Sequence, residues 1–191
     1  MITTDQTLID KEIRARASGD LQSSALQGGL MGALFGFLFG AAAGMLNRSA
    51  SGTLMGAVLG AVVGGAAAIP ARNAIRDYAL YCVSNNIRGV QVSAATQGLL
   101  WLGPVLGAAV GVWAAGNFSR HGLKLAAGAI LAGVVASFVV PMVGQLAFPE
   151  DYSDHIAEHL GQSVLSSLLV GGLVGLGVAF AARPQPGESF A

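Results

Sequence analysis

Charged residues are scarce in this sequence, and that scarcity limits what the protein can be. Only 10% of the 191 residues are charged, with 10 basic and 10 acidic side chains and a net charge of zero. A soluble globular domain carries about 25% charged residues, so the composition argues against a soluble protein. Between residues 28 and 71 the only charged residue is Arg48, and between residues 90 and 148 there are only Arg120 and Lys124.

Cysteine and the common catalytic motifs are also nearly absent. The single cysteine, Cys82, excludes a disulfide within one chain. The first 20 residues are polar and contain four acids, which we interpret as the lack of a signal peptide. The sequence has no phosphate-binding P-loop and no nucleophile elbow with acid and base partners. These absences argue against the common classes of hydrolase and nucleotide-binding enzyme.

One short pattern does match a metal-site motif. In "HIAEH" at 155–159, an inverted zinc-protease pattern, His155 and His159 would bind zinc and Glu158 would act as a base. Such a site needs a further ligand and a substrate cleft, and the only acid downstream is Glu188. We therefore interpret the segment as a surface loop with titratable histidines. We predict a protein that is not an enzyme, needs no metal or cofactor and binds no nucleic acid.

Long hydrophobic runs are what the sequence has instead. Hydrophobic residues make up 53% of the chain and the mean hydropathy is +0.64. Apolar runs of about 20 residues are typical of membrane-spanning helices. We therefore predict an all-α fold, a small polytopic membrane protein of about five Gly/Ala-rich helices joined by short amphipathic helices. The predicted spans are roughly 26–46, 52–70, 97–116, 124–146 and 163–182.

Glycines recur at every fourth position in several of these spans. Glycine costs about 1 kcal/mol relative to alanine in a water-exposed helix, but in lipid the backbone must hydrogen-bond internally and the helix is enforced. Small residues four apart then let two helix backbones approach closely. The pattern leaves open whether these stripes line a pore or only pack helices. The candidate residues are Gly28, Gly32, Gly36, Gly40, Gly44, Gly52, Gly56, Gly60, Gly64, Gly103, Gly107, Gly111, Gly171 and Gly175.

The chain also repeats itself, with a period near 71 residues. "SSALQGGLMG" at 23–32 matches "SSLLVGGLVG" at 166–175, and the turn sequence "NRSASG" at 47–52 resembles "NFSRHG" at 117–122. An internal repeat at this spacing indicates duplicated helical units. We predict one helical membrane domain over 1–191, divided into a polar segment 1–22, repeat units 23–92 and 93–162, a last span 163–182 and a disordered tail 183–191.

The connecting segments carry most of the polar residues. Residues 71–90 place Ala71, Ile75, Tyr78 and Cys82 on one helical face, as expected either of a helix in the headgroup layer or of one packed on the bundle. Basic residues number six on the N-terminal side of the membrane and four on the other, a small bias for a cytoplasmic N-terminus. In mid-span the polar groups are mainly Ser137, which argues against ion-coupled transport. A narrow path lined by backbone, glycine and hydroxyls remains compatible with the sequence.

The tandem stripes at Gly28–Gly44 and Gly52–Gly64 resemble those of glycine-zipper pore-forming antibacterial effectors of bacterial type VI secretion systems. The resemblance covers roughly residues 26–112, about half of the chain. It implies export without a signal peptide inside a secretion-tube ring protein that acts as carrier. It further implies insertion into the inner membrane of a target cell, ion leakage that collapses the membrane potential, and a cognate membrane immunity protein. A homo-oligomer is compatible with this function.

A second resemblance leads to a different class of function. Mitochondrial import translocases also use glycine-zipper spans, so the alternative is a structural membrane subunit or translocase-like scaffold without its own ion flux. The five predicted spans and the acidic segment 149–161 fit those translocases less well. Release of ions from lipid vesicles distinguishes the two functions.

Overall fold

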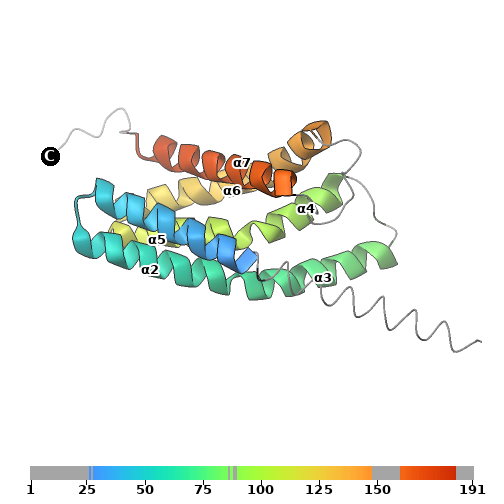
Figure 1. The fold of residues 1–191 in the computed structure, drawn as a ribbon, viewed down its shortest axis with the longest axis horizontal. Coiled ribbons are helices and arrows are strands. Elements are labelled where there is room, and N and C mark those ends of the chain that lie inside the picture. The colour runs from blue at the N-terminus through green and yellow to red at the C-terminus, as the bar shows by residue number, and fades with distance from the viewer. Residues whose placement is uncertain (1–25, 27, 86, 88–89, 148–159, 184–191) are drawn as a thin grey trace, which may run out of the picture.

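The computed structural model describes residues 26, 28–85, 87, 90–147 and 160–183, and these form an elongated bundle of helices (Figure 1). The all-α prediction is confirmed. The N-terminal segment 1–22, the acidic segment with the "HIAEH" pattern up to residue 159 and the tail from residue 184 lie outside the described residues. The helices are Gly28–Leu46, α2 Ala50–Ala66, α3 Ala68–Ser84, α4 Val90–Leu100, α5 Leu102–Ala115, α6 Arg120–Ala147 and α7 Leu160–Ala181.

Four helical stretches are long and apolar enough to cross a membrane, and there are five if a bent helix pair counts as one span. The stretches are Gly28–Leu46, Ala50–Cys82, Arg120–Gly144 and Val164–Ala181, and the bent pair is formed by α4 and α5. The prediction of about five spans is therefore confirmed in number. Because a membrane-spanning helix needs about 20 apolar residues, the protein has the helices of a multi-span membrane protein.

Small residues fill the interior of the bundle and large apolar residues cover its outside. Ala108 and Ala129 are fully buried, whereas Leu46 and Leu146 are each 84% exposed. Every long helix carries exposed large side chains, such as Leu54 on α2. Soluble proteins rarely expose contiguous apolar patches of this extent. The surface therefore suits contact with lipid.

The third predicted span, 97–116, is bent. Its helices α4 and α5 meet at Trp101 with an angle of 47°. Pro104 lies four residues after Leu100, so it has no N–H to donate to the Leu100 carbonyl, and its ring crowds that carbonyl. The helical hydrogen bonds on either side persist, from Trp101 N to Gln97 O at 3.0 Å and from Val105 N to Trp101 O at 3.0 Å. The proline accounts for the kink.

The second predicted span does not end at Pro70. After a break at Ala67 the chain continues as α3, and the apolar stretch Ala50–Cys82 is 33 residues long. Pro70 is the third residue of α3, as Pro104 is of α5, and has no N–H to donate to the Ala66 carbonyl. The next helical bond persists, from Ala71 N to Ala67 O at 3.2 Å. At about 1.5 Å per residue, the stretch is longer than the hydrocarbon core of a bilayer, about 30 Å thick.

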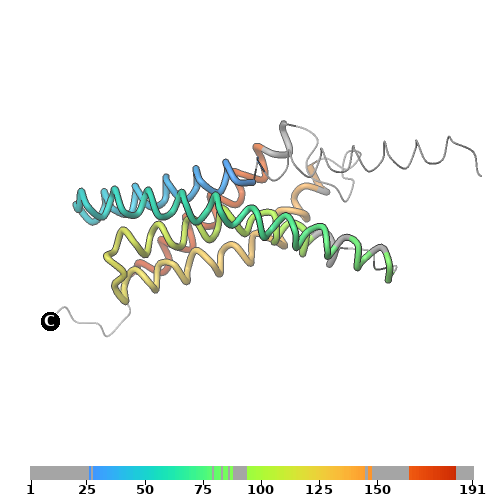
Figure 2. Tube along the Cα trace, turned by 90° about the horizontal axis from the view of Figure 1, so that it is seen from below, coloured from blue at the N-terminus to red at the C-terminus, as the bar shows by residue number. Residues whose placement is uncertain are grey.

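Helix α3 packs against α4. Of the two positions expected for residues 71–90, in the headgroup layer or on the bundle, this contact favours the bundle. Ala71 and Cys82 are buried, and Ile75 and Tyr78 are half-buried. Figures 1 and 2 show α3 extending α2 along the bundle. The helix is therefore part of the bundle on one face, while residues such as Arg76 face outward.

The two similar turn sequences adopt similar structures. Ser49 caps α2 by accepting a hydrogen bond from Gly52 N at 3.0 Å, and Ser119 accepts one from Gly122 N at 3.1 Å. In each turn the second residue after the preceding helix is left-handed, with φ of 52° at Arg48 and 53° at Asn117, and in the second turn Phe118 is left-handed as well, with φ of 55°. The shared S-x-x-G spacing thus ends one helix and starts the next within a few residues.

Candidate functional site: the glycine junction

Glycines of the helix Gly28–Leu46 face glycines of α2 along the whole length of this hairpin. An added Cβ on Gly36 would overlap the backbone of Gly60, and one on Gly60 would overlap the backbone of Gly36. Because the helices are antiparallel, each glycine before the turn meets one equally far after it. Figures 1 and 2 show the two helices side by side. The facing pairs are Gly32 with Gly64, Gly36 with Gly60, and Gly40 with Gly56.

Helix α5 brings a third stripe to the same place. An added Cβ on Gly107 would lie 2.8 Å from Gly32 O and 2.9 Å from Gly60 O. One on Gly111 would lie 2.8 Å from Gly36 O. We call the meeting point of the three stripes the glycine junction. Its residues are Gly32, Gly36, Gly40, Gly56, Gly60, Gly64, Gly103, Gly107 and Gly111.

The glycine junction is a contact between backbones. A real Cβ does not come within 3.0 Å of such atoms, and most of the crowding atoms here are backbone carbonyls, which cannot rotate away as a side chain can. Lipid tails provide no hydrophobic drive for helices to associate, so packing of this closeness takes its place. Since each stripe covers the others, the junction glycines are all buried.

The other predicted glycines have different surroundings. Gly28 has nothing within 4 Å of an added Cβ, and one on Gly44 would overlap the backbone of Thr53. An added Cβ on Gly52 would lie 2.7 Å from the carbonyl oxygen of Ala115. Gly171 and Gly175 of α7 lie outside the glycine junction, so α7 is held differently.

Aromatic rings of the first helix cover the glycines of α7. An added Cβ on Gly171 would lie 3.4 Å from the ring of Phe35, and one on Gly175 would lie 3.9 Å from that of Phe39. These are ordinary van der Waals distances. The Phe35 ring also stands 6.4 Å from the Trp101 ring, between centroids.

A fourth close helix contact joins α6, whose Gly128 and Ala132 form a weaker small-residue stripe in the sequence, to α7. An added Cβ on Gly128 of α6 would lie 2.8 Å from the Ala181 Cβ, and one on Gly177 of α7 would lie 2.6 Å from the Ala132 Cβ. Gly128 and Gly177 also face each other's carbonyls. In the sequence each helix carries a pair of small residues four apart, Gly128 with Ala132 and Gly177 with Ala181, in which alanine takes the place of the second glycine.

Comparison of the chain with protein-family models, with curated proteins and with solved structures finds no match.

Two buried polar side chains in the spans make local hydrogen bonds, whereas the buried Trp113 Nε1 of α5 has no hydrogen-bond partner among the described residues. The Ser137 hydroxyl, the main mid-span polar group predicted from the sequence, is buried and donates to the Val134 carbonyl of its own helix at 2.7 Å. The Trp101 Nε1 donates to Gln97 Oε1 at 3.2 Å. Ser137 also faces Gly98, where an added Cβ would lie 3.3 Å from the Ser137 Cβ. Because its hydroxyl is bonded to its own helix and packed against a neighbouring one, it is poorly placed to coordinate a passing ion.

Proposed function

We propose that this chain is a non-enzymatic structural subunit of a membrane, held closed by the glycine junction and without ion flux of its own. The observation that carries the proposal is that the three glycine stripes cover one another. A stripe that lined a pore would leave the glycine backbones facing water. Here the backbone of Gly36 faces that of Gly60 instead, with Gly111 against both helices.

The outer surface supports the same function. A pore built from several copies needs a small or polar face on the outside of each copy. On α6 the outward residues in mid-span are large and apolar, among them Ile130, Leu131 and Val134. On the helix Gly28–Leu46 they include Leu34 and Leu38. These faces suit lipid or the apolar span of a partner subunit.

One observation favours the pore-forming effector as a second candidate. Among the spans that stand alone as one helix, α7 is the least buried, with 11% of its apolar window inside the bundle. Toward the first helix it makes ordinary contacts, in which Phe35 and Phe39 cover Gly171 and Gly175. Helix α7 could separate from the first helix there and leave the glycine junction intact. Such an opening would give an effector carried by a ring protein a route to an inserted, leaking form.

Vesicles loaded with potassium test the two candidates. The purified chain is reconstituted at increasing protein-to-lipid ratios, without nucleotide or metal, and a potential-sensitive dye reports the diffusion potential. A structural subunit holds the potential at every ratio, as do protein-free vesicles. Loss of the potential, graded with the amount of protein, would overturn the proposal and favour the effector. An ionophore added at the end defines full release.

A further inference from the structure

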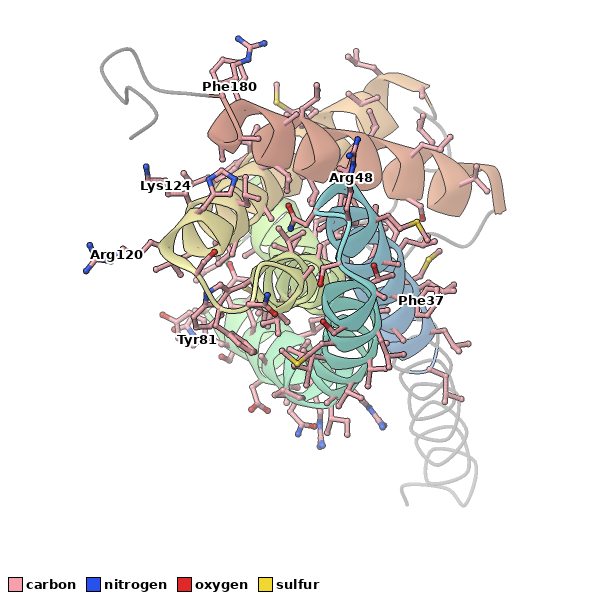
Figure 3. The ribbon with its side chains drawn as sticks, turned by 90° about the vertical axis from the view of Figure 1, so that its left-hand side faces the viewer. Phe37, Arg48, Tyr81, Arg120, Lys124 and Phe180 are labelled. Carbon is pink, nitrogen blue, oxygen red and sulfur yellow. The ribbon has the colours of Figure 1, made fainter. Side chains whose placement is uncertain are left out.

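One end of the bundle is strongly basic. Arg48 lies in the turn before α2, Arg120 and Lys124 begin α6, and Arg183 follows α7, and all four side chains are exposed. Figure 3 looks onto this end, with Arg48 in the first turn and Arg120 and Lys124 projecting from the start of α6. We call this surface the basic end, defined by these four residues. The four residues come from three separate parts of the chain: two turns and the end of α7.

Acidic residues are concentrated elsewhere. The segments 46–50, 116–124 and 182–183, which carry the four cations, contain no aspartate or glutamate. Among the described residues the acidic side chain is Asp77, on α3 at the opposite end of the bundle. In the sequence, nine of the ten acids belong to the N-terminal side of the predicted spans, together with six basic residues. Net charge therefore distinguishes the two ends more clearly than the number of basic residues does.

Exposed aromatic rings accompany the cations. Phe180 is 69% exposed, and the Arg183 guanidinium lies 4.5 Å from its ring centroid. Phe118 is 47% exposed and stacks edge-on against Trp113, with 5.1 Å between ring centroids. Apolar rings such as phenylalanine beside exposed Lys and Arg side chains suit insertion of the rings at the boundary between headgroups and hydrocarbon.

We propose that the basic end binds the phosphate headgroups of anionic phospholipids in one leaflet. Arginine presents a planar fork of donors that matches phosphate oxygens, and clusters of Lys and Arg next to a span are attracted to anionic leaflets. The exposed Phe118 and Phe180 distinguish this partner from a free anion, because a soluble phosphate gives no reason for aromatic rings at the edge of the apolar band. This inference is independent of whether the bundle conducts ions.

Lipid retention tests the proposal. The full chain is exchanged into detergent with equal amounts of phosphatidylglycerol and phosphatidylcholine, and native mass spectrometry counts the lipids bound to each molecule. We expect phosphatidylglycerol to be retained preferentially. Arg120→Gln with Arg183→Gln should lower its retention roughly tenfold. The matched control is Arg72→Gln with Arg76→Gln on α3, which removes two cations at the other end and should change retention less than twofold.

Each alternative outcome contradicts the proposal in a distinct way. An equal loss of phosphatidylglycerol retention in both double variants would mean that the overall charge of the protein governs binding. Equal retention of the two lipids would remove the headgroup preference, and displacement by millimolar inorganic phosphate would indicate a site for free anions. Thermal melting of each variant in lipid-free detergent checks that the bundle is folded, so lost retention at an unchanged melting temperature is assigned to the substituted side chains.

Discussion

Replacing Gly36 by alanine tests the glycine junction most directly. The new methyl group would overlap the carbonyl of Gly60 and press on the backbone nitrogen of Ala61. Neither group can move without moving α2 as a whole, because both belong to its hydrogen-bonded backbone. The shift would also disturb α5, since an added Cβ on Gly111 lies only 2.8 Å from Gly36 O.

The magnitude follows from the cost of overpacking. Inserting a methylene-sized group into a packed interior costs about 1–3 kcal/mol. Alanine also stabilises a helix relative to glycine by up to about 1 kcal/mol, which offsets part of that cost. We expect Gly36→Ala to lower the free energy of unfolding by about 1–2 kcal/mol after this offset. Gly60→Ala should behave alike, and the double variant should cost less than the two combined, because both methyl groups compete for one space.

The control uses the same substitution where the space is open. Gly28 and Gly172 have nothing within 4 Å of an added Cβ, so Gly28→Ala and Gly172→Ala should be neutral or slightly stabilising. Unfolding is followed in mixed detergent micelles by the fluorescence of Trp101 and Trp113. If Gly36→Ala is as stable as Gly28→Ala, the backbones do not touch at this pair and our account of the glycine junction is refuted.

Five further substitutions test the turns and the kink. Arg48→Gly should raise the melting temperature, because a left-handed residue other than glycine costs about 1–2 kcal/mol. Asn117→Gly should raise it by less, since asparagine tolerates this conformation. A lower melting temperature for Arg48→Gly would contradict the strain. Ser119→Ala should lower the free energy of unfolding by about 1 kcal/mol through loss of the cap, whereas Ser119→Asn, which can still accept the hydrogen bond, should not. Pro104→Ala restores an amide donor for the Leu100 carbonyl and should reduce the 47° bend, seen as a longer distance between spin labels on α4 and α5; an unchanged distance would assign the bend to packing.

Much of the helical architecture was predictable because the sequence separates charge from apolar residues so sharply. A run without charge from residue 49 to residue 70 has few options other than a buried or lipid-facing helix. The ends of the helices were harder to predict. The predicted span 52–70 ends at Pro70, but a proline removes a single helical bond, and the apolar stretch continues into α3 as far as Cys82.

Contacts between distant helices were less predictable. The spacing predicted that glycines line one face of a helix, but every glycine stripe is chemically alike, so the sequence could not say that α5 joins the first two helices. The contact between Gly128 and Gly177 was hard to predict for a similar reason, because alanines, Ala132 and Ala181, complete the small faces of the two helices. Alanine is common throughout the chain, so its presence at one face gave little signal.

The pairing within the first hairpin, however, is encoded by the length of its turn. The turn centres on Arg48, and the paired glycines stand at equal distances on either side of it, as Gly36 and Gly60 do. One added residue in the turn would displace a stripe by about 1.5 Å and about 100° around its helix, so Gly36 would no longer face Gly60. The glycine spacing and the short turn capped by Ser49 therefore work only together. That dependence explains why a left-handed residue stands at position 48: the chain must reverse within three residues between two helices whose stability rests on backbone contact.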